Sequence, residues 1–252
     1  MYPNRPAIGS LAWASGREPA LSRREQVELL VPILTTTARY ARSRIALALR
    51  VSPSHGVNVR DLVPPDTRLS RAAEAAAHAA LSPGMLNHSY RTFAFGTALA
   101  QLGGTKVDPE ELYVTSLMHD IGFPNVARGH DFAIEGGKQM RELARSCGSD
   151  EATSQRLGDA VARHATPGVS PQSDPLAGLV SQGALLDLMG LRGELIDPDE
   201  RLAVDARFPR CNVLPEIESG WKAHARALPG GRCDYIERVS MFTTIARLAP
   251  WK

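Results

Sequence analysis

The chain lacks most of the features that mark membrane, secreted or nucleic-acid-binding proteins. No stretch approaches the roughly 18 consecutive apolar residues that indicate a transmembrane helix. Residues 1–19 contain no apolar core of the kind found in signal peptides. No block of like charges occurs and the formal net charge is only +2, so the electrostatic footprint of a nucleic-acid binder is missing. We therefore expect no membrane and no nucleic-acid partner.

Cysteine is also scarce. The 3 cysteines, Cys147, Cys211 and Cys233, lie far apart and form no CxxC motif. An odd and scattered set argues against a disulfide scaffold and for a reducing compartment. We therefore expect a cytoplasmic location.

Strand-like alternation of apolar and polar residues is almost absent, whereas helix signals recur along all 252 residues. Asp108-Pro109 is a clear helix start, with a capping side chain followed by proline at the first helical position. Pro32 is expected to kink or split the first long helix. Helices are predicted over 22–50, 67–81, 83–104, 108–122, 131–146, 149–164, 174–190, 215–228 and 234–247, with a loop over 51–66. The predicted fold class is all-α.

Two histidines and two aspartates are placed in the apolar runs of three of these helices. His88 and the dipeptide His119-Asp120 lie in the helices over 83–104 and 108–122, and Asp187 lies near the end of a third. Burying imidazoles and carboxylates without partners is costly, and a divalent cation removes that cost. Histidine and aspartate without cysteine suit zinc, iron or manganese. We expect one such ion, and the sequence leaves a second ion open.

A coordinated water would follow from such a site. Ligands supplied by separate helices are typical of a metal site inside a helical bundle. Histidine and carboxylate sites often keep a water whose pKa is lowered toward neutrality, and that water would be the nucleophile.

Five motifs in this order resemble the HD-domain superfamily of metal-dependent hydrolases. They are LNHSYRTFAFG around His88, LMHDIG at 117–122, FAIEGGKQ at 132–139, ARHATPG at 162–168 and QGALLDLMG at 182–190. The string is most similar to the cyanamide hydratase branch of that superfamily. The resemblance covers residues 66–190 well, and it is weak outside them.

The resemblance implies a single-domain helical bundle around a central metal. Residues 66–190 would form the metal-binding core, 1–65 a helical extension packed on it, and 191–252 helices that complete the same domain. The resemblance implies that His88, His119, Asp120 and Asp187 are the metal ligands. It also implies a pocket role for His164, our candidate general acid, and structural or substrate-side roles for Asn87, Ser89, Arg91 and Phe132. His130 and Glu135 are further candidates for a metal or substrate contact.

The function implied is a hydratase or hydrolase that adds metal-activated water to a small nitrogenous substrate, with cyanamide and its hydration to urea as the leading example. One departure concerns the substrate, because Ala165-Thr166-Pro167 follows His164 where many relatives have glutamine and an acidic residue. The first alternative is an HD-type phosphohydrolase of a nucleotide or another small phosphate ester. It would require clustered cations near the ligands, and the candidates Arg91, Arg128, Lys138 and Arg163 are scattered in the sequence.

The second alternative is a non-catalytic metal-binding regulatory module, against which the complete set of four candidate ligands argues. In the two enzymatic readings the partner is a small-molecule substrate. The sequence leaves formation of a homo-oligomer open.

Overall fold

The computed structural model describes residues 5–50 and 62–250, and within them it confirms the all-α prediction. These residues form helices and connecting segments without a β-strand. The predicted loop over 51–66 lies outside the described residues except for 62–66, which are irregular. The helices are α1 (Leu11–Ala14), α2 (Arg23–Leu49), α3 (Arg68–Ala80), α4 (Pro83–Gly103), α5 (Pro109–Met118), α6 (Phe132–Ser146), α7 (Glu151–Arg163), α8 (Pro175–Met189), the 3₁₀ turn η1 (Gly193–Leu195), α9 (Pro198–Arg207), α10 (Val213–Ala227), α11 (Arg232–Ser240) and α12 (Phe242–Arg247).

The helices around the predicted metal site begin at their predicted caps. The Asp108 side chain accepts hydrogen bonds from the backbone N–H groups of Glu110 and Glu111, which fixes the start of α5. The Asp131 side chain does the same for the first turn of α6. These caps fix where each helix begins and, through the helical period, which residues face the core.

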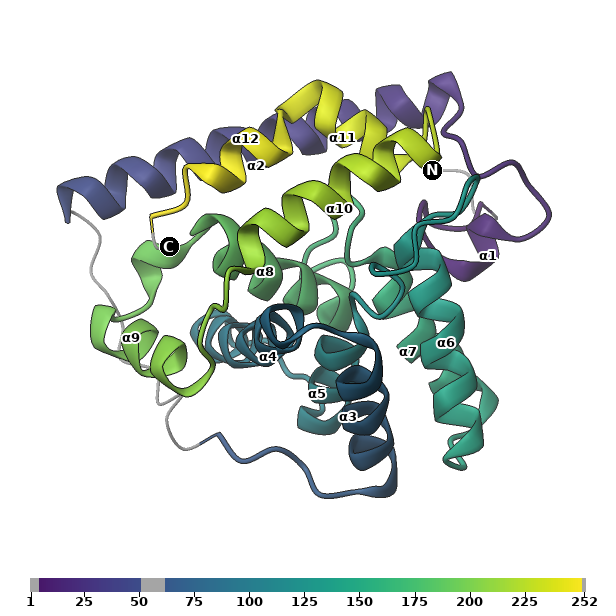
Figure 1. Ribbon diagram of the computed structural model, residues 1–252, viewed down its shortest axis with the longest axis horizontal. Helices are drawn as coiled ribbons and strands as arrows, with labels where there is room; N and C mark the ends of the chain where they lie inside the picture. Colours follow the sequence, from purple (N-terminus) through teal and green to yellow (C-terminus); the bar gives the residue numbers. More distant parts are fainter. Residues whose placement is uncertain (1–4, 51–61, 251–252) are drawn as a thin grey trace.

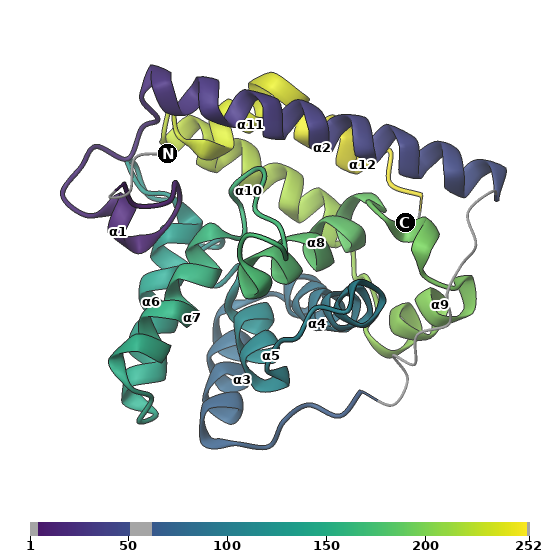
Figure 2. The ribbon, with the colours of Figure 1, turned by 180° about the vertical axis from the view of Figure 1, so that it is seen from behind.

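The core is built around α4, α5 and α8. α4 packs along α8, α5 contacts both, and α3 packs against α5 (Figure 1). α10 lies between this core and an outer layer in which α2 runs beside α11 and α12, an arrangement seen from both sides of the molecule (Figures 1 and 2). α2 from the N-terminal part of the chain and α11 and α12 from the C-terminal part therefore share one outer layer.

α6 and α7 pack as a tight antiparallel pair at one end of the molecule (Figure 2). A Cβ atom added at Gly137 would lie 2.6 Å from the carbonyl oxygen of Gly158 and 2.7 Å from Cβ of Ala162. The sequence Gly136-Gly137 inside a helix thus serves close helix approach. This contact holds α6 against α7, the helix that ends at His164.

The structure corrects several predicted boundaries. α2 continues through Pro32 as one helix of 27 residues rather than splitting there. The helix predicted over 234–247 is two helices, because Met241 adopts a left-handed conformation (φ 54°) between α11 and α12. α1 and α9 were not predicted, although Asp197-Pro198 carries the same start signal as Asp108-Pro109.

Contacts between distant segments tie the chain together. The backbone N–H of Leu11 donates to Oδ1 of Asp159 over 2.7 Å, α11 packs on α2, and α12 contacts α8. The predicted division of the chain at residues 65 and 190 stays a prediction. Among the described helices, none combines the length and the apolar character that crossing a bilayer would require.

Candidate metal centre

Three potential metal ligands converge in the core. His88 comes from α4, whereas His119 and Asp120 follow directly after α5, and all three are buried. Nε2 of His119 lies 3.2 Å from Nε2 of His88 and 3.2 Å from Oδ2 of Asp120. Nε2 of His88 lies 3.8 Å from the same carboxylate oxygen. One ligand atom from each residue therefore lies within 4.8 Å of the others.

The outer nitrogens of both imidazoles are occupied by acceptors. Nδ1 of His119 lies 2.7 Å from the carbonyl oxygen of Ser116, and Nδ1 of His88 lies 2.7 Å from Oδ2 of Asp187. A carbonyl or carboxylate oxygen accepts, so each Nδ1 carries the proton and donates it. The two Nε2 atoms then turn lone pairs toward one another and toward the Asp120 carboxylate.

Such an arrangement is unfavourable unless a proton or a cation lies between the lone pairs. Two imidazole nitrogens and one carboxylate oxygen form a donor set that zinc and non-haem iron both accept. His88, His119 and Asp120 therefore fit a divalent metal ion. Their outer hydrogen bonds fix the tautomer that metal binding requires.

The structure places Asp187 differently from the prediction that it supplies a fourth ligand. Its Oδ2 accepts from Nδ1 of His88, and Nε of Arg91 donates to its Oδ1 over 2.7 Å. Arg91 adds a second bond of 2.9 Å, and the Arg210 guanidinium lies 3.1 Å from the carboxylate. Asp187 thus lies behind His88 and orients its imidazole, because two arginines hold the carboxylate there.

His164 ends α7 on the other side of Asp120. Its Nδ1 donates to the carbonyl oxygen of Val161 over 2.6 Å, and its Nε2 lies 3.5 Å from Oδ1 of Asp120. Its ring meets the His119 ring edge-on at 4.9 Å between centroids and contacts the Phe132 ring at 5.8 Å. His164 and Phe132 therefore adjoin the centre, as their motifs suggested.

Four other predicted residues do not face the centre. The Asn87 amide donates to the carbonyl oxygen of Pro209, and the Ser89 hydroxyl donates to the backbone of its own helix. The His130 ring lies 3.2 Å from the Glu135 carboxylate, and both side chains are partly solvent-exposed. The helical period points Asn87 and Ser89 away from His88, and the first turn of α6 carries Glu135 outward.

The electrostatics of the buried cluster follow from burial and from mutual pairing. Burial lowers the pKa of His88 and the pKa of His164. Burial also opposes protonation of His119, but the adjacent Asp120 carboxylate raises the pKa of His119 overall. Although burial disfavours the Asp120 carboxylate, His119 and His164 hold the pKa of Asp120 well below its usual range. Asp120 is therefore an anion at neutral pH, ready to bind a cation.

A second buried charged cluster was missed by sequence reasoning. The Arg232 guanidinium forms two hydrogen bonds of 2.7 Å with Asp131, the residue that caps α6. It also donates to the carbonyl oxygen of Ala162 and to the hydroxyl of Thr166. This pair joins α11 to the segments that carry Phe132 and His164. Its only sequence signal was the capping pattern at Asp131, which does not reveal a partner 101 residues away.

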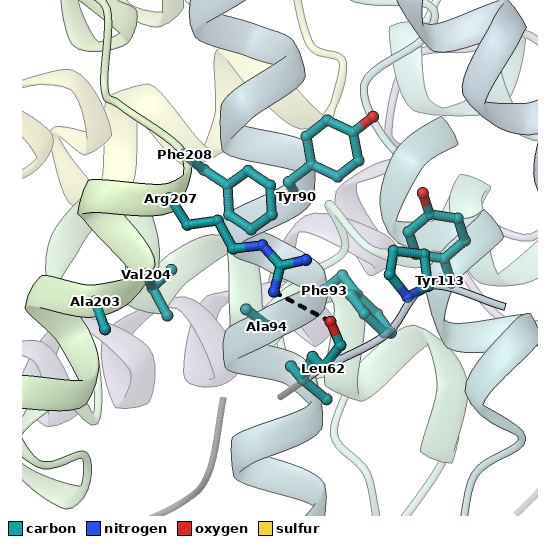
Figure 3. Close-up of a pocket in the computed structure, with 10 residues that line it drawn as sticks. Leu62, Tyr90, Phe93, Ala94, Tyr113, Ala203, Val204, Arg207 and Phe208 are labelled. Carbon is teal, nitrogen blue, oxygen red and sulfur yellow. Dashed lines mark hydrogen bonds between the residues drawn. The ribbon is translucent and has the colours of Figure 1, made fainter. Parts of the chain in front are cut away.

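One pocket in the described residues lies apart from the centre. It is lined by side chains of α4, α5 and α9, including Tyr90, Phe93, Tyr113 and Phe208, with Leu62 and Arg207 at its edge (Figure 3). None of its lining residues belongs to the His88–His119–Asp120 cluster. A second, very small pocket is lined by Phe132, Cys233 and His224, and Phe132 also contacts His164.

Comparison with known proteins matches residues 85–206 to the HD domain family. The matched segment, just under half of the chain, is therefore similar to an HD domain. Two relatives are cyanamide hydratase DDI2 and cyanamide hydratase DDI3 of Saccharomyces cerevisiae. Each is 29% identical over 157 residues, which covers 60% of this chain and 70% of the relative. The matched segment contains His88, His119, Asp120 and Asp187, and HD domains bind divalent metals. These similarities support a metal-dependent hydrolytic enzyme.

Proposed function

We propose that this protein is a metal-dependent hydratase that adds water to a small uncharged nitrogenous substrate, with cyanamide converted to urea as the specific reaction. The observation that carries the proposal is the buried convergence of two imidazole Nε2 atoms and one carboxylate, whose ligand atoms all lie within 4.8 Å of one another. The similarity to two yeast cyanamide hydratases supports the choice of substrate.

In this proposal His88, His119 and Asp120 hold one divalent metal, zinc or iron being the best suited and manganese acceptable. Three protein ligands are the number found in catalytic zinc sites, which keep a position open for water or substrate. The bound metal would act as a Lewis acid and lower the pKa of a coordinated water toward neutrality. Asp187 and the Ser116 carbonyl would keep the two imidazoles in the required tautomer and orientation.

His164 and Asp120 would move the proton. Hydration forms a bond from the water oxygen to the nitrile carbon, and the proton released by the water goes to the nitrile nitrogen. The resulting isourea becomes urea by shifting one further proton from oxygen to nitrogen. Nε2 of His164 lies 3.5 Å from Oδ1 of Asp120, close enough for the two side chains to hold and transfer that proton.

The charges around the centre favour a neutral substrate over a phosphate ester. Arg91 is committed to Asp187 behind His88, Arg163 pairs with Asp174, and Lys138 pairs with Glu135. On the His164 side the neighbours include the Phe132 ring. A phosphate would require several cations gathered on the open side of the centre, and the candidates named from the sequence do not gather there.

The test is a urea-release assay on cyanamide with the metal-loaded protein, run beside a phosphate-release assay on nucleoside monophosphates. We expect urea and no phosphate. Release of phosphate without urea would make the protein a phosphohydrolase, and a metal-loaded protein that does neither with these or other small nitriles would be a binding module.

The proton-transfer role has its own test in His164→Ala. Turnover should fall by roughly 10²–10⁴-fold, the usual contribution of a general acid–base group, while metal content stays at the wild-type level. Loss of the metal in this variant would make His164 a ligand instead.

A further inference from the structure

α10 places two buried ring nitrogens without partners beside the metal centre. Trp221 and His224 are 6% and 3% exposed and lie one turn apart on the buried face of the helix. Nε1 of Trp221 and Nδ1 of His224 are buried, and neither finds a hydrogen-bond partner among the residues that the structure describes. An unpartnered buried polar atom costs about 1–3 kcal/mol, so two of them on one helix face call for an explanation.

The two nitrogens are of opposite kinds. The indole N–H of Trp221 can only donate. Nε2 of His224 lies 2.8 Å from the carbonyl oxygen of Phe123, which can only accept, so Nε2 carries the proton. Nδ1 of the neutral ring is then an acceptor. One helix face therefore offers one donor and one acceptor, each awaiting a complementary atom.

Both rings contact Phe132, the aromatic side chain that also contacts His164. The centroid of Phe132 lies 5.2 Å from that of His224, 6.2 Å from that of Trp221 and 5.8 Å from that of His164. His224, but not Trp221, also lines the very small pocket that Phe132 and Cys233 share. The unpartnered nitrogens are thus one aromatic ring away from the proposed proton-transfer group.

We propose that Trp221 and His224 form a recognition site for a small neutral molecule that carries both an N–H donor and an acceptor atom. The indole N–H binds the acceptor of the ligand, and Nδ1 of His224 accepts its N–H. The aromatic surroundings (Phe132, Phe123 and Phe242) exclude an ion, because an unpaired charge would be costly to bury there. Cyanamide and simple amides meet this description.

The inference rests on the proposed function in taking the ligand to be the substrate of the metal centre. It adds the determinants of specificity, which lie on α10 and outside the segment matched to the HD domain family. Neither residue carries a motif in the sequence, and only their burial without partners draws attention to them.

Kinetics of two conservative variants test the pair. Trp221→Phe removes the indole N–H and keeps an aromatic ring. His224→Gln keeps a donor for the Phe123 carbonyl and displaces the acceptor from the position of Nδ1, since its own acceptor is the amide oxygen beside that donor. Each variant should raise the KM for cyanamide by roughly three- to tenfold, the loss of one hydrogen bond, with kcat within about twofold and metal content unchanged. Lys222→Met, which breaks only the pair with Glu218 on the same helix, is the matched control and should leave KM near the wild-type value.

Dimethylcyanamide separates the two roles, since it keeps the nitrile acceptor and has no N–H to donate. Trp221→Phe should still raise the KM for this substrate, whereas His224→Gln should not. Equal effects of His224→Gln on both substrates would overturn the assignment of Nδ1 as the acceptor of a substrate N–H.

Direct binding to the metal-loaded wild-type protein keeps the inference independent of turnover and of variant folding. The chain has 3 tryptophans, and the indole N–H resonance of Trp221 is the one absent from the spectrum of Trp221→Phe. If that variant does not fold, Trp13→Phe and Trp251→Phe identify the Trp221 resonance by elimination.

We expect the Trp221 indole N–H resonance to shift saturably with formamide, a probe that has the same kinds of donor and acceptor as the proposed ligand. A resonance that does not move, together with unchanged KM values, would mean that water alone occupies the site and would overturn the proposal. A shifting resonance in a protein that releases no urea would refute the cyanamide reaction and leave the recognition site standing.

Discussion

Two of the buried charged clusters in the described part of the chain differ in how their polar atoms are satisfied. In the Asp131–Arg232 cluster each donor meets an acceptor, with two bonds of 2.7 Å between the side chains and further bonds to the Ala162 carbonyl and the Thr166 hydroxyl. In the His88–His119–Asp120 cluster two acceptor nitrogens lie 3.2 Å apart.

This difference separates a structural cluster from a ligand site. A buried ion pair with all its hydrogen bonds made holds segments together and needs nothing from outside. A buried cluster whose lone pairs converge is complete only when a cation is added. The two clusters are neighbours, since α6 begins at Asp131 and its next residue, Phe132, contacts His164. We call the Asp131–Arg232 cluster the closed cluster and the His88–His119–Asp120 cluster the open cluster. The closed cluster thus holds the segments that surround the open cluster.

The largest expected effect comes from breaking the open cluster. His119→Ala should lower turnover by at least about 10³-fold, because the metal supplies several kcal/mol of transition-state stabilisation. The fold should persist, since the variant removes a single hydrogen bond, to the Ser116 carbonyl, just beyond the end of α5 and relieves the close approach of the two Nε2 atoms. Steady-state assays and circular dichroism of the same preparation check both expectations. Full activity without metal would refute the site.

Breaking the Asp131–Arg232 cluster should lower the stability of the fold and leave metal binding intact. Arg232→Met leaves the Asp131 carboxylate buried and unpaired, and should lower the free energy of unfolding by about 3–5 kcal/mol. Metal should still bind to the folded fraction. Denaturant titration measures the loss, and Arg145→Met, which breaks an exposed pair with Glu151, should cost within about 1 kcal/mol. A loss for Arg232→Met no larger than that of Arg145→Met would remove the distinction between the clusters.

Asp187→Asn sharpens the comparison by weakening the support of one imidazole. Metal affinity should fall by roughly 10–100-fold, the usual effect of losing a carboxylate that orients a ligating histidine. Asp205→Asn is the matched control, since Asp205 also pairs with Arg210 and is absent from the hydrogen bonds of His88. Competition titration with a chelating dye gives both affinities. Equal losses in the two variants would show that arginine pairing, and not orientation of His88, is what the titration measures.

The smallest expected effect is the pH dependence of the closed cluster. Burial opposes ionisation of Asp131, but Arg232 outweighs it and lowers the pKa of Asp131 in the folded state. A depressed folded pKa stabilises the protein fully above the unfolded value of about 3.9, and this contribution is lost as pH falls from there toward the folded value. Below about pH 4 the free energy of unfolding should therefore fall less steeply in Asp131→Asn than in wild type, with chelator present in both. If the free energy of unfolding fell equally steeply with pH in the two proteins, the lowered pKa could not be assigned to Asp131.

The sequence predicted those parts of the fold that depend on local signals. Helix starts at Asp108 and Asp131 were predicted because a capping side chain acts within its own first turn. The helix that leads to His119 was predicted from its apolar period, although it ends at Met118 and not at Gly122. The continuity of α2 through Pro32 was not predicted, because it depends on packing between segments that are far apart in sequence.

The same distinction between local signals and contacts of distant segments applies to the candidate site. The resemblance of the five motifs to HD-domain proteins implied that His88, His119, Asp120, His164 and Phe132 belong to one site. It could not show that Asp187 would be held behind His88. That position depends on Arg91 and Arg210, which reach the carboxylate from two other elements. The importance of Trp221 and His224 was hidden for a related reason, because a missing partner becomes visible only when all neighbours are in place.

Elemental analysis of the purified wild-type protein tests the central claim most directly, namely that the His88–His119–Asp120 cluster binds a divalent metal. One equivalent of zinc, iron or manganese per folded chain is predicted, with none retained in Asp120→Ala. A folded wild-type protein that binds no divalent metal, even after incubation with excess zinc, iron or manganese, would contradict the account.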